Sequence, residues 1–276
     1  VNNGVDTDDS SLYSCMLGSD YGKQMKKAGK WLDEYLKEED EKKAEKEKAA
    51  SETPTQEESE QTDSEDTEVN TDSSKATDSS ASIFDKIMKS SSTAKDETDS
   101  TEDEQTEEDI TIKIAAIQES IGSEEQLMRA QGYQTMLEKY SDWEMVAQQT
   151  GDNSREEAQK VMKLFLEQEP DLRVVFAESD EMALGAIDAI EKSGKTCGED
   201  GDIIVISFGG SKAGIEAVKE GKLNVTFECN PGQGPKAAEL IQRLESDISI
   251  DKEQYVEETY FDGTMDLDEI IENRTY

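Results

Sequence analysis

Residues 174–185, VVFAESDEMALG, constrain the fold of this chain more than any other stretch. A short apolar run leads through an acidic turn directly into a segment with helical spacing, which is typical of one strand-to-helix unit in a parallel α/β domain. Two further apolar runs, residues 203–210 and 223–235, also lead into helix-like segments. Ligands of such domains bind at the carboxyl ends of the strands, so these strand exits predict a site as well as a fold.

The same alternation of strand and helix begins near residue 110. The expected strands are residues 110–118, 144–149, 171–177, 203–208 and 223–229. A helix-like segment follows each of them, and Ser123-x-x-Gln126 and Ser154-x-x-Glu157 predict the start of two of these helices. Consecutive β-α units of this kind predict a doubly wound α/β lobe around a parallel sheet.

Composition excludes several classes of function. The 276 residues carry a formal net charge of −38 and contain no histidine. Such an acidic chain is repelled by phosphate backbones and anionic lipid, so we expect no nucleic-acid partner. Without histidine, and with Cys15, Cys197 and Cys229 outside any CxxC spacing, we expect no metal or other cofactor. No nucleophile–base pair or phosphate loop is evident, and we expect a protein that is not an enzyme and has no membrane span.

Residues 37–109 consist almost wholly of Glu, Asp, Ser, Thr and Lys. Such a segment cannot bury enough apolar surface to offset the entropy of ordering it, and it predicts an acidic disordered insert. Its first part, residues 37–48, is compatible with an extension of the preceding helix. Its one apolar island, residues 83–88, fits either a docking motif or a transient helical turn.

The two ends of the chain do not fit inside the repeated lobe. We expect residues 1–36 to be one β-α unit of an amino-terminal lobe that lies mostly upstream of Val1. Residues 110–250 would form a complete carboxyl-terminal lobe, and residues 251–276 the hinge return and the closing helix of the amino-terminal lobe. A chain that leaves one lobe, builds a second and returns has a two-lobe hinged plan.

Five motifs carry a family resemblance: VVFAESDEMALGAI, IIVISFGG, GKLNVTFECNPGQGP, GSDYGKQMKKAGKWL near the start and ENRTY at the end. They resemble the sugar-binding proteins of bacterial ABC importers, and most closely the galactofuranose- and galactose-binding branch of the ribose-binding type. The resemblance implies a type I periplasmic-binding-protein fold that closes on a monosaccharide. It also implies an ABC permease as partner and a periplasmic or extracellular location, where many such proteins are lipoproteins.

The resemblance implies three polar anchors in the carboxyl-terminal lobe: an arginine in its first helix, an asparagine in the turn after the third strand and an aspartate after the fourth. Arg129 matches the arginine, and its guanidinium could donate two hydrogen bonds to sugar oxygens. The alternative is a surface ion pair with Glu125. Ser179 stands at the asparagine position and Gly209 at the aspartate position. Restoring both anchors is expected to strengthen the binding of a galactose-type sugar.

Other candidate ligand-binding residues lie at neighbouring strand ends. Phe208 either lies against the sugar face or belongs to the core, and Glu228 points either to the ligand or to solvent. Cys229 occupies a position where ribose binders carry glutamine. Asn2 and Asn3 fall where the family has Asp-Arg at the hinge.

Asp180 and Glu181 form an adjacent pair of carboxylates, but their place in the first turn of a helix is explained by capping and the helix dipole. Two alternatives to sugar transport remain open. One is the effector-binding core of a LacI-type regulator. The other is a degenerate surface sensor or interaction module that no longer binds sugar.

Overall fold

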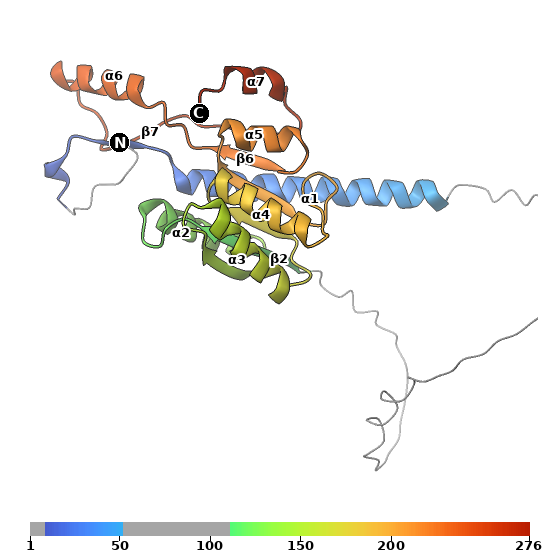
Figure 1. The fold of residues 1–276 in the computed structure, drawn as a ribbon. Helices are drawn as coiled ribbons and strands as arrows, with labels where there is room; N and C mark the ends of the chain where they lie inside the picture. The colour runs from blue at the N-terminus through green and yellow to red at the C-terminus, as the bar shows by residue number, and fades with distance from the viewer. Residues whose placement is uncertain (1–8, 52–110) are drawn as a thin grey trace, which may run out of the picture. The chain divides into compact units, whose positions relative to one another are not determined.

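The computed structural model describes residues 9–51 and 111–276 of the chain (Figure 1). The chain divides into one unit of Val1–Glu47 with Asp109–Tyr276 and a second unit, Lys48–Glu108. All elements below except the last residues of one helix belong to the first unit. Several expectations lie outside the described residues: Asn2, Asn3, the apolar island at 83–88 and the acidic insert from residue 52 onward.

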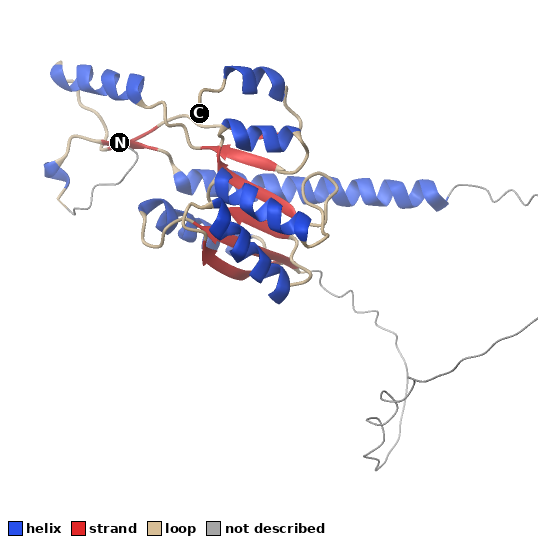
Figure 2. Ribbon diagram, in the orientation of Figure 1, coloured by secondary structure: helices blue, strands red, loops and turns tan. Residues whose placement is uncertain are grey.

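A six-stranded sheet forms the centre of the first unit (Figure 2). Its strands are β2 (Ile112–Gln118), β3 (Trp143–Thr150), β4 (Val174–Ala177), β5 (Ile204–Gly209), β6 (Val225–Glu228) and β8 (Tyr260–Asp262). They lie in the order β3-β2-β4-β5-β6-β8, and all neighbours are parallel except β8, which is antiparallel to β6. The five expected strands and their parallel arrangement are confirmed.

Helices cover both faces of this sheet, as the doubly wound prediction requires. One face carries α3 (Arg155–Gln168), α4 (Asp180–Lys192), α5 (Lys212–Lys219) and α7 (Leu267–Asn273). The other face carries α1 (Tyr21–Ser51) and α2 (Glu124–Lys139). Two apolar clusters, one on each face, therefore share the sheet as their common wall. The expected N-caps are confirmed: Ser123 accepts a hydrogen bond from the backbone N–H of Gln126, and Ser154 from that of Glu157.

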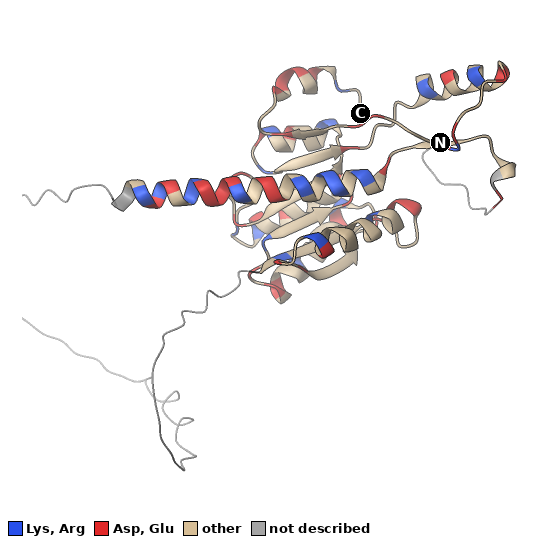
Figure 3. Ribbon diagram, turned by 180° about the vertical axis from the view of Figure 1, so that it is seen from behind, with Lys and Arg blue, Asp and Glu red and all other residues tan. Residues whose placement is uncertain are grey.

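The position of α1 corrects one expectation. We expected residues 21–36 to belong to a different lobe, but Met25, Ala28 and Leu32 are buried in the same apolar cluster as the strands of the six-stranded sheet. A Cβ atom on Gly132 of α2 would lie 2.5 Å from Met25 Cβ, so the two helices approach closely where the glycine leaves room. The helix continues to Ser51, and its second half carries mixed charges (Figure 3).

The opposite correction applies to α6 (Gly234–Glu245), which falls within the carboxyl-terminal lobe expected for residues 110–250. Only Leu240 of this helix is buried, while Ile241 is 56% exposed. The helix therefore does not pack into either cluster.

The strand β8 and the helix α7 were assigned to the amino-terminal lobe. In the structure β8 extends the six-stranded sheet and α7 covers one of its faces.

A separate two-stranded sheet pairs β1 (Met16–Gly18) with β7 (Glu253–Tyr255) in parallel. The chain crosses between the two sheets three times: after β1, after β6 and between β7 and β8. The crossing segments lie side by side, since Val256 N donates to Gly18 O at 3.0 Å and Glu228 N donates to Thr259 O at 2.9 Å.

Candidate functional site

Arg129 of α2 lies at the carboxyl edge of the six-stranded sheet. Its side chain is 1% exposed, and the guanidinium carbon lies 4.9 Å from the ring centroid of Tyr21 and 4.7 Å from that of Phe208. Two aromatic faces therefore fix the plane of the guanidinium by cation–π contact. Its ionic partner is Glu119, with Nη1 3.2 Å from Oε1, and the alternative of a surface ion pair with Glu125 is not observed.

Some N–H groups of the Arg129 guanidinium lack a strong acceptor. Nη2 donates only to the weak acceptor Cys229 Sγ, at 3.6 Å. Nε makes no hydrogen bond with any described residue, and Nη1 has only the ion pair with Glu119. Buried N–H groups without an acceptor are rare because each costs the free energy of its lost hydration. The arrangement therefore fits an additional acceptor, such as an oxygen-rich ligand.

A cavity of 370 Å³ borders Arg129. It is lined by Tyr21, Glu119, Ser120, Ser123, Glu125, Arg129, Asn153 and Cys229. The volume is that of a site for a small molecule, and the lining combines one aromatic ring with convergent polar groups. Its position beyond the carboxyl ends of parallel strands is the place where α/β sheets bind ligands.

Glu178, which follows β4, was not singled out in the sequence. It is 1% exposed, and burial raises its pKa to about 7 against the opposing effect of Arg129. Its Oε2 accepts a hydrogen bond from Glu119 N at 2.9 Å, while Oε1 has no hydrogen-bond partner among the described residues. Burial also raises the pKa of Glu119, partly offset by Arg129. Two carboxylates and one guanidinium thus form a largely desolvated cluster.

Ser179 and Gly209, the two altered anchors, have local structural roles. The hydroxyl of Ser179 caps α4 by accepting from Met182 N at 3.3 Å. Gly209 has φ +149°, and a Cβ atom there would lie 2.6 Å from Asp180 Oδ2. An aspartate at position 209 would therefore meet an existing carboxylate, and the structure argues against the expectation that restoring it strengthens binding.

Asp180 lies in the first turn of α4, as expected, and its side chain is buried. Its carboxylate accepts hydrogen bonds from Ser207 Oγ at 2.6 Å, Thr226 Oγ1 at 2.7 Å and Ser211 N at 2.7 Å. The sequence contains an indication of this buried hydrogen-bond network, because Ser207 and Thr226 are polar residues inside apolar strands.

The side chains of Glu228 and Cys229 point to different parts of the structure. Glu228 is buried and points to the carboxyl-terminal segment, where its Oε1 accepts from Arg274 Nη1 at 2.8 Å and from Tyr276 OH at 2.7 Å. Cys229 lines the cavity beside Arg129, and burial raises the pKa of its thiol to about 11. The thiol is therefore neutral. Among the sequence candidates that lie in the described residues, Phe208 and Cys229 have side chains in contact with Arg129.

Two features are absent from the described residues. No group of three or more metal-ligating side chains occurs within residues 9–51 and 111–276. No helix in the same part of the chain has the length and apolarity needed to span a bilayer.

Comparison with known proteins places the chain among binding proteins. A model of the family described as "Periplasmic binding protein domain" matches residues 58–247. The ribose import binding protein RbsB of Salmonella typhimurium is 34% identical over 133 residues, which are 48% of this chain and 43% of that protein. The galactofuranose-binding protein YtfQ of Escherichia coli is 25% identical over 137 residues, 49% of this chain and 42% of that protein. The chain thus spans less than half the length of these relatives.

Among solved structures, the periplasmic binding protein of the arabinose ABC transporter from Shewanella sp. ANA-3, bound to arabinofuranose, superposes with a TM-score of 0.67. The identity is 20%, and the superposition covers 99% of this chain and 67% of the other. This likeness shows a shared fold, the hinged α/β architecture of periplasmic binding proteins.

Proposed function

The chain belongs to the periplasmic binding protein domain family, and from this premise we propose that it acts as the solute-binding component of an ABC-type carbohydrate importer. Its ligand is a monosaccharide of galactose or galactofuranose type. The names of its relatives support a sugar: ribose for one and galactofuranose for another. An ABC permease and export to the periplasm or cell surface belong to the same proposal.

The observation that carries the proposal is the buried guanidinium of Arg129 at the wall of the 370 Å³ cavity, where Nε has no hydrogen-bond partner among the described residues. A sugar presents several hydroxyl oxygens, and each can accept a hydrogen bond from a guanidinium N–H group. Tyr21 and Phe208 hold the guanidinium in place before ligand arrives, which reduces the entropy lost on binding.

In this proposal the protein closes around its ligand, and no covalent bond is made or broken. A ligand held by donors at this edge of the sheet stabilises a closed state in which a second surface also contacts it. The three crossing segments are where such a hinge would bend. A permease that recognises the closed shape would distinguish loaded from empty protein.

Titration calorimetry with galactose, arabinose and ribose tests the proposal on this chain. We expect heat for at least one sugar, and an affinity about tenfold lower in Arg129→Lys, because lysine keeps the charge but loses the fork. Arg243→Lys, on the exposed side of α6, is the matched control and should bind as the parent does. Absence of heat with every sugar would favour the degenerate module, and equal affinity in Arg129→Lys would remove Arg129 from the site.

A further inference from the structure

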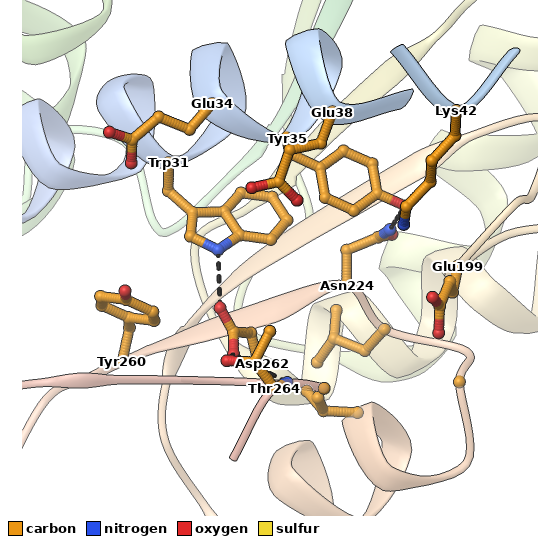
Figure 4. A pocket seen from close by; sticks show the side chains of 14 residues that line it. Trp31, Glu34, Tyr35, Glu38, Lys42, Glu199, Asn224, Tyr260, Asp262 and Thr264 are labelled. Atoms are coloured by element: carbon orange, nitrogen blue, oxygen red, sulfur yellow. Dashed lines mark hydrogen bonds between the residues drawn. The ribbon is translucent and has the colours of Figure 1, made fainter. Parts of the chain in front are cut away.

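A second cavity lies at the other end of β6. Cys229, which lines the first cavity, follows β6 directly, whereas Asn224, which lines the second, precedes it directly. The second cavity has a volume of 320 Å³ and lies between α1, the start of β6 and the end of β8 (Figure 4). Nothing in the proposed sugar site uses these residues.

Aromatic rings form one part of its wall. Trp31 and Tyr35 of α1 stack with ring centroids 4.9 Å apart and planes at 19°, and Tyr260 of β8 also lines the cavity. Hydrogen bonds fix two of the rings: Trp31 Nε1 donates to Asp262 Oδ2 at 2.9 Å, and Asn224 Nδ2 donates to Tyr35 OH at 3.1 Å (Figure 4). The ring faces are therefore preorganised.

Carboxylates form another part of the wall of this second cavity. Glu34, Glu38, Glu199 and Asp262 line the cavity, and Lys42 is the one basic residue in the lining. Asp262 is engaged by Trp31 and Thr264, and Glu34 pairs with Lys30 at 3.1 Å. Glu38 and Glu199 have no ion pair with any described residue. The cavity thus combines aromatic faces with an excess of negative charge.

These features together select one class of ligand. The face of an aromatic ring attracts a cation through its quadrupole, and neighbouring carboxylates add to the attraction. A hydrated metal ion would gain little from the rings, whereas an alkylammonium ion presents an apolar surface together with its charge. We propose that this cavity binds a small alkylammonium ion, with its charged group against Trp31, Glu38 and Glu199.

Tetramethylammonium chloride is the probe, because it carries the charge and cannot form hydrogen bonds, and tert-butanol is a neutral molecule of similar shape. The readout is the indole N–H signal of Trp31 in a ¹H–¹⁵N NMR spectrum of the intact chain, assigned with a Trp31→Phe variant. The signal of the other tryptophan, Trp143, which is buried under α2, is the internal reference. We expect tetramethylammonium to shift the Trp31 signal with a dissociation constant on the order of millimolar, and tert-butanol to leave it in place.

Charge variants separate recognition from loss of folding. Glu38→Gln combined with Glu199→Gln changes two exposed side chains, so the fold is retained, and should weaken binding about fivefold. Glu41→Gln combined with Glu216→Gln makes the same charge change on exposed residues outside the cavity and should leave the affinity as it is. The proposal is wrong if the cation causes no shift, if tert-butanol shifts the signal equally, or if both pairs of substitutions have the same effect.

Discussion

Asp180 occupies the space that a side chain on residue 209 would need. A Cβ atom on Gly209 would lie 2.6 Å from Asp180 Oδ2, at a backbone φ of +149°. The carboxylate cannot easily withdraw, because it is held by Ser207, Thr226 and Ser211. The glycine and the buried aspartate are therefore one structural unit.

Gly209→Ala should lower the free energy of unfolding by about 3 kcal/mol, from steric overlap with Asp180 and from the unfavourable φ. Gly194→Ala is the matched control: it too has a positive φ, but no atom of the described residues lies within 4 Å of its Cβ position, so the loss should be about 1 kcal/mol. Urea unfolding measures both. Equal losses would show that Asp180 moves aside freely.

Stability should depend on pH through Glu178, whose pKa burial raises to about 7. Below pH 4.5 the carboxyl is protonated in both states. Between that value and about 7 only the unfolded chain ionises, so unfolding is increasingly favoured as the pH rises, by up to about 3 kcal/mol above pH 7. Glu178→Gln should remove this decline and Glu167→Gln, an exposed control, should keep it. Urea unfolding of all three proteins at pH 5 and pH 8 measures the difference.

Arg274→Met should cost about 3 kcal/mol of stability, because it leaves the buried carboxylate of Glu228 without its ionic partner. Adding Glu228→Gln should recover part of that loss, since the uncompensated charge disappears. A double-mutant cycle by thermal or urea unfolding gives the coupling. Additive losses would contradict a direct interaction between these two side chains.

Glu258 joins all three crossing segments. Its Oε1 accepts from Ser19 Oγ at 2.6 Å and from Asn230 N at 2.8 Å. Glu258→Ala should therefore speed hydrogen exchange of the Asn230 amide about tenfold, which corresponds to about 1.4 kcal/mol. Glu257→Ala alters the exposed neighbour and should leave that rate unchanged. An unchanged rate in Glu258→Ala would mean that the amide is protected by other contacts.

The order and kind of the elements could be predicted because each depends on local chemistry. Ser123 and Ser154 mark helix starts through hydrogen bonds to amides three residues away, and buried parallel strands require unbroken apolar runs. The face against which α1 packs could not be predicted. Periodicity shows which side of a helix is apolar but not which sheet covers it.

The candidate site was predictable only in part for the same reason. Arg129 could be found from its motif, but its partners Tyr21, Phe208 and Glu119 come from three other segments that only the fold brings together. The partners of Glu228 could not be predicted either. Alternation along a strand gives two directions for a side chain, and neither direction identifies Arg274 and Tyr276 as partners that lie 46 and 48 residues away.

The helix α1 provides a wall for both cavities: Tyr21 lines the first and Trp31 the second. Ten residues of α1 separate them, which is a rise of about 15 Å along the helix axis. Between these two residues, Met25 and Ala28 are buried in the apolar cluster on the six-stranded sheet. The packing that fixes α1 on the sheet therefore also sets the distance between the two cavities.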